Sequence, residues 1–177
     1  MVKASPFASR TYALQALGPS WTEIGRLRTI MGCTIDGCKN GRCLTTLINM
    51  TEGPGSDPGV NVYERQLKAF LHIWCRQLEI RPLCVRVWST IYRRIHACSA
   101  ICRAKAVRGQ IYGLIVSLMQ LGWAVEDPLS WVSPLGSLWT IPRGGIQCNA
   151  KDHTPFLDAV RDSAQKKYWC TAALREN

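Results

Sequence analysis

The chain has 177 residues, a length that fits one domain, or one domain with a loosely attached end. Hydrophobic residues make up 47% of it, which excludes wholesale disorder and supplies enough apolar material for a core. The formal net charge of +10 favours anionic partners such as nucleic acid, acidic membrane surfaces or acidic proteins. A basic surface without a binding partner would have the same composition.

The N-terminal segment lacks the continuous apolar stretch of a secretory signal, so we expect an intracellular, reduced protein, nuclear or cytoplasmic. Lys3, Arg10 and the absence of any acidic residue before Glu23 also fit an organelle transit peptide, which leaves an organellar location open. The longest apolar run, 111–119, is shorter than the roughly 20 residues that a membrane-spanning helix needs. We therefore expect no transmembrane segment.

The first predicted helix begins at a capping box, in which Ser20 and Glu23 can each bond the other's backbone N–H. Apolar residues at helical spacing follow, and we place the end of this helix at Gly32. The Pro- and Gly-rich segment 51–59 is predicted to be a linker. Residues 1–60 are therefore expected to hold short helices and Gly/Cys-rich loops, with loose packing.

A basic helical core is expected over 61–177. Apolar residues at helical spacing predict helices at about 62–79, 83–107 and 110–121. Asn61 is the expected N-cap of the first of these, because a glutamate follows it three residues later. The first two helices carry basic residues outside their apolar stripes.

The C-terminal part combines a hairpin with one more helix. Pro128, Pro134 and Pro142 exclude a long helix across that stretch, and short aromatic runs predict a β-hairpin at about 130–141. The hairpin tryptophans are expected in the core rather than stacked on bases, because few basic residues adjoin them. Thr154 and Pro155 predict the start of the last helix. The predicted fold is a mainly α, small helical domain of about four to five helices with a short Trp-containing β-hairpin.

The basic segment 64–108 is the most specific local feature, with ten Lys or Arg residues against two Glu. Guanidinium groups on two adjacent helices can make charge-assisted bonds to phosphates and release counterions, which positions nucleic acid without reading its sequence. A solvated helix face or a protein–protein surface would show the same pattern. The candidate nucleic-acid-binding residues are Arg76, Arg86, Arg93, Arg94, Arg103, Lys105 and Arg108.

No complete catalytic set or cofactor motif is visible. Cys33, Cys38 and Cys43 are evenly spaced and are weak candidates for a zinc site, but a fourth ligand at diagnostic spacing is missing. Buried thiols are the favoured interpretation of the cysteines. His153, just before the last helix, is expected to serve in turn and capping chemistry rather than as a base. We therefore expect no catalytic residues and no cofactor.

The segment 113–141 resembles part of the non-LTR retrotransposon polyproteins that are abundant in some large algal genomes. The shared pattern is an apolar helix, a Gly-Trp pair, a proline and two further tryptophans around a glycine turn. Here these are Leu118, Leu121, Gly122, Trp123, Pro128, Trp131, Gly136 and Trp139. The segments 27–29 and 157–176 resemble further parts of the same region, so that the resemblance covers most of the chain from about residue 20.

The resemblance implies a thumb- or connection-like region downstream of the reverse transcriptase core. The polymerase aspartates of that family cannot be carried over, because this chain has no Asp-Asp pair. What it implies is a non-catalytic domain that grips RNA or DNA by the backbone without sequence specificity. The alternative is a structural subunit of a larger protein assembly, in an organelle or elsewhere, whose basic face contacts other subunits, RNA or lipid headgroups.

Overall fold

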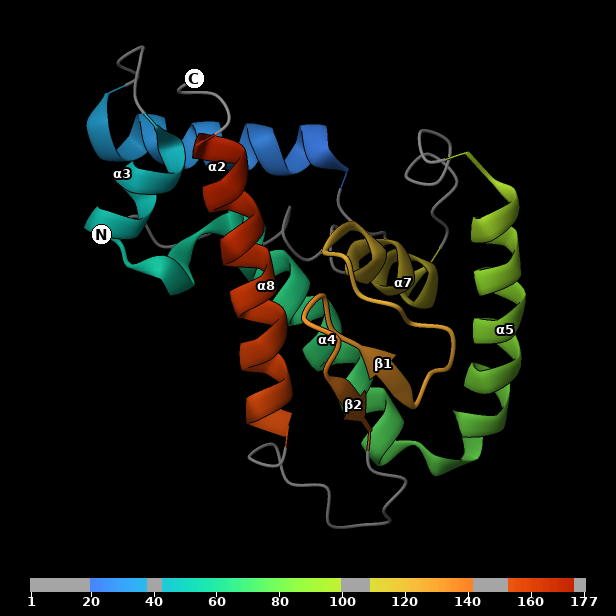
Figure 1. Ribbon diagram of the computed structural model, residues 1–177. Helices are drawn as coiled ribbons and strands as arrows, with labels where there is room; N and C mark the ends of the chain where they lie inside the picture. Colours follow the sequence, from blue (N-terminus) through green and yellow to red (C-terminus); the bar gives the residue numbers. More distant parts are fainter. Residues whose placement is uncertain (1–19, 38–42, 100–108, 142–152, 174–177) are drawn as a thin grey trace.

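The computed structural model describes residues 20–37, 43–99, 109–141 and 153–173. These ranges contain six α-helices and one two-stranded antiparallel sheet (Figure 1), so the predicted mainly helical fold with a Trp hairpin is confirmed. The elements are α2 (Trp21–Asp36), α3 (Leu44–Thr51), α4 (Pro58–Arg76), α5 (Arg81–Ala97), α7 (Gln110–Gln120), β1 (Ser130–Val132), β2 (Leu138–Thr140) and α8 (Thr154–Ala173). None of the helices in these ranges is both long and apolar enough to cross a bilayer.

Helix α4 is the central element, because α2, α7 and α8 all pack against it (Figure 1). It begins at Pro58, earlier than the start that Asn61 predicted. The N-cap is Asp57, whose side chain accepts a 2.8 Å hydrogen bond from the Gly59 backbone N–H. Pro58 occupies the first turn, where its missing N–H costs no helical hydrogen bond. The expected capping role of Asn61 was therefore wrong.

An aromatic cluster joins four elements of the core. Trp131 of β1 is fully buried, with its ring centroid 5.7 Å from Trp88 of α5, 6.1 Å from Phe70 of α4 and 4.9 Å from Phe156 of α8. The two strands are joined across a glycine turn as expected, and their register pairs Trp131 with Trp139. The prediction that the hairpin tryptophans belong to the core is confirmed for Trp131, while Trp139 is half-buried against the same cluster.

The C-terminal ends of α2 and α5 differ most from their predictions. Helix α2 continues past Gly32 to Asp36, and Gly37 ends it in the left-handed conformation with φ of 66°. Gly32 lies inside the helix, at a position where a Cβ would stand against the Leu44 side chain of α3. Helix α5 ends at Ala97, not near residue 107, and the next residue is extended. Its last buried residue is at position 95, so the burial that stabilises this helix ends there.

Segment 51–59, predicted to be a linker, contains a 3-10 turn at Pro54–Ser56 and the buried Asp57. The carboxylate of Asp57 forms an ion pair with Arg28 of α2, with 3.0 Å between Arg28 Nη2 and Asp57 Oδ2. Arg28 Nη2 also donates a 2.7 Å hydrogen bond to Thr45 of α3. This segment therefore ties α2 and α3 to the start of α4.

Candidate nucleic-acid interface

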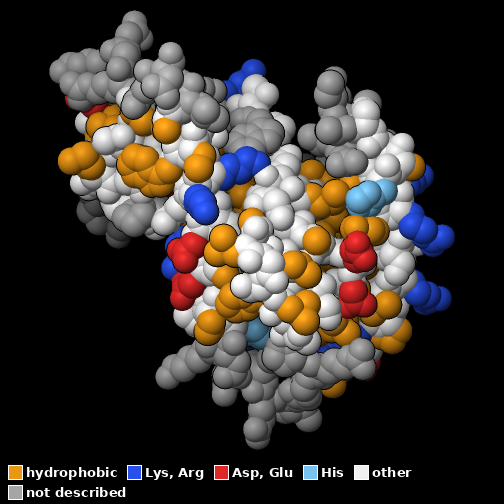
Figure 2. All heavy atoms as spheres, viewed as in Figure 1, with side chains coloured by type: hydrophobic (Ala, Val, Ile, Leu, Met, Phe, Trp, Pro, Cys, Tyr) orange, Lys and Arg blue, Asp and Glu red, His pale blue; other side chains and the backbone are white. Residues whose placement is uncertain are grey.

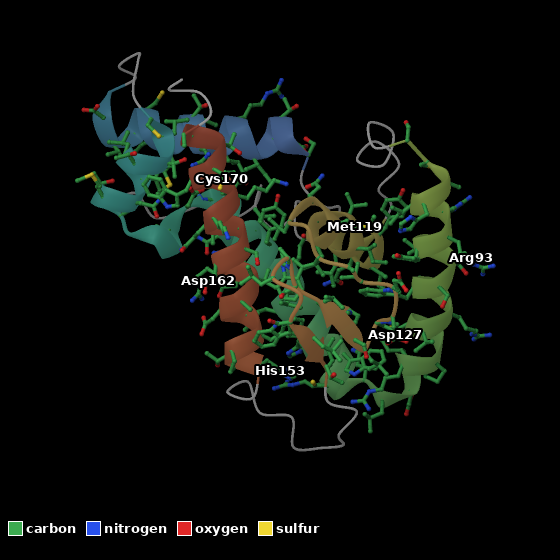
Figure 3. All side chains as sticks on the ribbon, in the orientation of Figure 1. Arg93, Met119, Asp127, His153, Asp162 and Cys170 are labelled. Atoms are coloured by element: carbon green, nitrogen blue, oxygen red, sulfur yellow. The ribbon has the colours of Figure 1, made fainter. Side chains whose placement is uncertain are left out.

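The outward face of α5 carries three exposed arginines. Arg86 and Arg93 are seven residues apart, so they lie almost in line, two helical turns apart, and Arg94 lies beside Arg93. The buried residues of this helix, among them Trp88, lie on its opposite side. Figure 3 shows Arg93 pointing away from the rest of the molecule, and Figure 2 shows Lys and Arg side chains along that edge. We call Arg86, Arg93 and Arg94 the α5 arginine face.

The guanidinium groups of the α5 arginine face are available to a partner. Helix α5 contains no acidic residue, and no carboxylate within the described ranges pairs with any of these three arginines. Arg93 Nε donates only a 3.3 Å hydrogen bond to the Ser89 carbonyl, one turn earlier. Three exposed positive charges on the solvent side of one helix, unpaired within the described ranges, give a local surface that attracts phosphates.

Acidic residues lie near α5 on a different side. Burial raises the pKa of the Tyr92 phenol, and the charge and hydrogen bond of Glu126 raise it further. Asp127, the next residue, lies on the loop between α7 and β1 that faces α5 (Figure 3). A polyanion would therefore approach α5 from its outward side, where the arginines lie, rather than along this loop.

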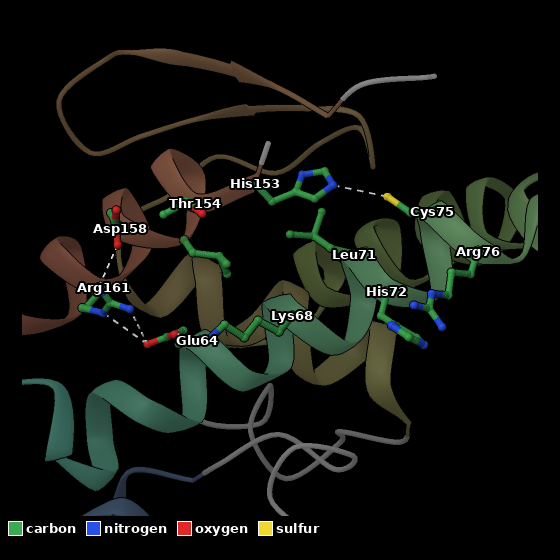
Figure 4. Close-up of a pocket in the computed structure, with 11 residues that line it drawn as sticks. Glu64, Lys68, Leu71, His72, Cys75, Arg76, His153, Thr154, Asp158 and Arg161 are labelled. Atoms are coloured by element: carbon green, nitrogen blue, oxygen red, sulfur yellow. Dashed lines mark hydrogen bonds and ion pairs between the residues drawn. The ribbon is translucent and has the colours of Figure 1, made fainter. Parts of the chain in front are cut away.

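The other predicted residues do not join this face within the described ranges. Arg76 lies in the last turn of α4, where it lines a cavity together with His153 (Figure 4). Arg103, Lys105 and Arg108 lie outside the described residues. The structure thus brings together the arginines of α5 and leaves Arg76 in a separate environment.

Two other basic residues, Lys68 of α4 and Arg161 of α8, are engaged with carboxylates instead. Glu64 of α4 is buried and pairs with Lys68 at 2.5 Å and with Arg161 Nη2 at 3.0 Å. Arg161 Nη1 also contacts Asp158 Oδ1 at 2.7 Å (Figure 4). Burial alone would raise the pKa of Glu64, but the hydrogen bonds and charges of Lys68 and Arg161 outweigh it, and the pKa is lowered. This network ties α4 to α8 and leaves these two cations less available to a phosphate.

Replacing Glu64 by Gln should remove a pH-dependent part of the stability. Because the folded-state pKa of Glu64 is lowered, its contribution is present above the unfolded value of about 4.3 and is lost as the pH falls through the folded-state pKa. Glu64→Gln should therefore lower the urea midpoint at pH 7 and have a smaller effect at pH 3. Asp162→Asn, an exposed change on α8, is the control. An equal decrease of the urea midpoint at both pH values would contradict a lowered pKa of Glu64 in the folded state.

The cysteines proposed as zinc ligands lie only in part within the described residues. Cys33 is in the last turn of α2 and Cys43 is the N-cap of α3, while Cys38 lies outside. Across the described ranges, no group of three or more His, Cys, Asp or Glu side chains is placed to hold a metal ion. The zinc hypothesis gains no support from this part of the chain.

Sequence analysis missed the contact between Cys75 of α4 and His153. The Cys75 Sγ and His153 Nε2 atoms are 3.3 Å apart, although the two residues are 78 positions apart in sequence. His153 lies just before α8, as expected, but it is buried, which the capping interpretation did not anticipate. No short motif links the two, so only the packing of α4 against α8 reveals the pair.

Comparisons with known proteins identify no relative of this chain. No protein-family model matches the chain, and comparisons with curated proteins and with solved structures give no significant match.

Proposed function

We propose that this chain is a non-catalytic domain that binds the backbone of RNA or DNA through the α5 arginine face, without sequence specificity. The observation that carries the proposal is that Arg86, Arg93 and Arg94 are exposed and unpaired with carboxylates within the described ranges, with Arg86 and Arg93 almost in line along α5. Contacts from such side chains to phosphate oxygens fix position and orientation but do not distinguish bases.

The helix geometry suits several phosphates at once. Arg86 and Arg93 are separated by about 10 Å along the helix axis, since each residue adds about 1.5 Å. Each guanidinium can then reach a different phosphate and form its own charge-assisted bonds. The net charge of +10 adds a longer-range attraction that speeds the encounter at low salt.

The resemblance to the region that follows the reverse transcriptase core supports the same proposal independently of the charges. A thumb-like region binds the backbone of its template–primer. In the described part of this chain, the α5 arginine face can make the same kind of contact. We propose on this basis that the chain is derived from a retroelement.

A pair of charge-matched double variants tests the proposed interface. Arg86→Glu with Arg93→Glu should weaken binding to a short labelled RNA by at least about tenfold at moderate salt, because two phosphate contacts become repulsions. Arg26→Glu with Lys166→Glu makes the same change in net charge at exposed positions on α2 and α8. This control should retain most of the affinity. Equal losses in both would show that only net charge matters and would contradict an interface on α5.

A structural role in a larger assembly is the second candidate, favoured by exposed apolar residues on the hairpin. Leu135 is 81% exposed and Leu138 is 68% exposed, and both lie at or beside the turn between β1 and β2. Exposed apolar clusters of this kind are typical of protein contacts. Native mass analysis decides between the candidates: stable subunits that co-purify with the chain and are lost on Leu135→Ser with Leu138→Ser would favour assembly.

A further inference from the structure

A cavity of about 450 Å³ lies between α4 and α8, apart from the α5 arginine face (Figure 4). Its size falls within the range of roughly 300–1,000 Å³ that small-molecule sites occupy. Cationic, acidic and imidazole side chains share its wall with apolar ones. Its lining includes Lys68, Cys75, Arg76, His153, Asp158 and Arg161.

The Cys75–His153 pair is the reactive feature of this cavity. Figure 4 shows the two side chains pointing toward one another from α4 and from the start of α8, with 3.3 Å between Sγ and Nε2. His153 is only 6% exposed, whereas Cys75 is half-buried and open to the cavity. An imidazole held at this distance can accept the thiol proton, which leaves a thiolate beside an imidazolium. The thiolate is the form of cysteine that attacks disulfides.

The charges around the pair favour an anionic reagent. The carboxylates of Glu64 and Asp158 are already paired with Lys68 and Arg161. Arg76, next to Cys75 in sequence, has no carboxylate partner within the described residues and lines the same cavity. A small molecule that carries carboxylates could therefore place them near Arg76 while its sulfur atoms approach Cys75.

We propose that Cys75 is a modification site that undergoes thiol–disulfide exchange with small anionic disulfides of the glutathione class. The Cys75 thiolate attacks one sulfur of the disulfide, a new S–S bond forms to Cys75, and the old S–S bond breaks. The second glutathione leaves as a thiolate, and the thiol proton passes to His153 Nε2. Cys75 is oxidised and the departing sulfur is reduced, so no further oxidant is required.

Site-resolved kinetics on the full, reduced chain test this proposal. The chain is treated at pH 7 with glutathione disulfide, which is anionic, or with iodoacetamide, which is neutral, and each cysteine is quantified by peptide mass analysis. Cys170, exposed on α8, is the internal reference for an ordinary thiol. Cys75 should react at least about tenfold faster than Cys170 with both reagents. Equal or slower reaction of Cys75 in the unmodified protein would overturn the proposal.

Two variants separate the roles of the neighbouring residues. His153→Gln keeps a side chain of similar size but removes the proton acceptor. The reaction rate of Cys75 should therefore fall to that of Cys170 with both reagents. Buried Cys84 reports folding, because it should stay unreactive in a folded variant. If this variant unfolds, the rate ratio in the unmodified protein still decides.

Arg76→Glu should slow the reaction of Cys75 with glutathione disulfide several-fold more than its reaction with iodoacetamide, because only the disulfide carries carboxylates that Arg76 would hold. Arg26→Glu, the same charge change on α2, should alter neither rate. A His153→Gln variant as reactive as the unmodified protein would overturn the role of the imidazole. Unchanged exchange with glutathione disulfide in Arg76→Glu would overturn the preference for an anionic reagent.

Discussion

Trp131→Ala is expected to lower the free energy of unfolding by about 3–5 kcal/mol, because it removes a fully buried indole from the centre of the core. Its ring contacts Trp88, Phe70 and Phe156, which come from three different helices. Those rings cannot all move inward to fill the space, since each is also fixed by its own helix. The remaining cavity therefore adds to the loss of buried apolar area.

Chemical denaturation measures this effect, with Leu138→Ala as the control from the same hairpin. Leu138 is 68% exposed, so its truncation should change the free energy of unfolding by no more than about 0.5 kcal/mol. A loss below about 1 kcal/mol for Trp131→Ala would mean that the aromatic cluster is not the centre of the core.

Asp57→Ala is expected to cost about 3–5 kcal/mol, the range for breaking a buried ion pair by removing one partner. The Asp57 side chain is 1% exposed and bonds both Arg28 and the Gly59 backbone N–H. Its removal leaves the Arg28 charge, 12% exposed, facing Thr45 and the Tyr168 ring, whose centroid lies 4.2 Å away. It also removes the N-cap of the central helix.

Asp57→Asn separates the two roles of this residue. The amide can still cap α4 through its oxygen but no longer neutralises Arg28, so an intermediate loss is expected. Asp162→Ala, at an exposed position on α8, should be close to neutral. If Asp57→Ala lowered the free energy of unfolding no more than Asp162→Ala, the ion pair would not stabilise the packing of α2 against α4.

Local signals predicted the elements that depend on neighbouring residues. The Ser20–Glu23 capping box forms as expected, with Ser20 accepting from the Glu23 N–H at 3.2 Å and Glu23 Oε2 accepting from the Ser20 N–H at 3.0 Å. The hairpin also follows from its own residues, because its turn and its paired tryptophans lie within a dozen positions. Such features need no knowledge of distant contacts.

Contacts between distant residues explain what sequence analysis missed. Asp57 lies in a Pro- and Gly-rich stretch typical of a linker, and only its ion pair with Arg28, 29 positions away, shows it to be part of the core. The Glu64–Arg161 and Cys75–His153 contacts span 97 and 78 positions. Periodicity describes one helix at a time and cannot identify which helices meet.

The candidate interface was predictable only within one helix. Helical periodicity places Arg86 and Arg93 on one side of α5, opposite its buried stripe, and the structure agrees. Arg76 was grouped with them because it is close in sequence, but it lines the cavity between α4 and α8. The turn between α4 and α5 determines how the two helices are oriented, and helical periodicity did not predict that orientation.

The salt dependence of nucleic-acid binding tests the central claim most directly. The affinity for a short labelled duplex of arbitrary sequence is measured at several salt concentrations. The plot of log affinity against log salt concentration should have a negative slope with a magnitude of at least about 2, because the α5 arginine face displaces counterions from about three phosphates. Arg86→Glu with Arg93→Glu should reduce the magnitude of that slope by about 2. Absence of binding at low salt, or a slope that this double variant leaves unchanged, would contradict the claim that α5 holds the phosphate backbone.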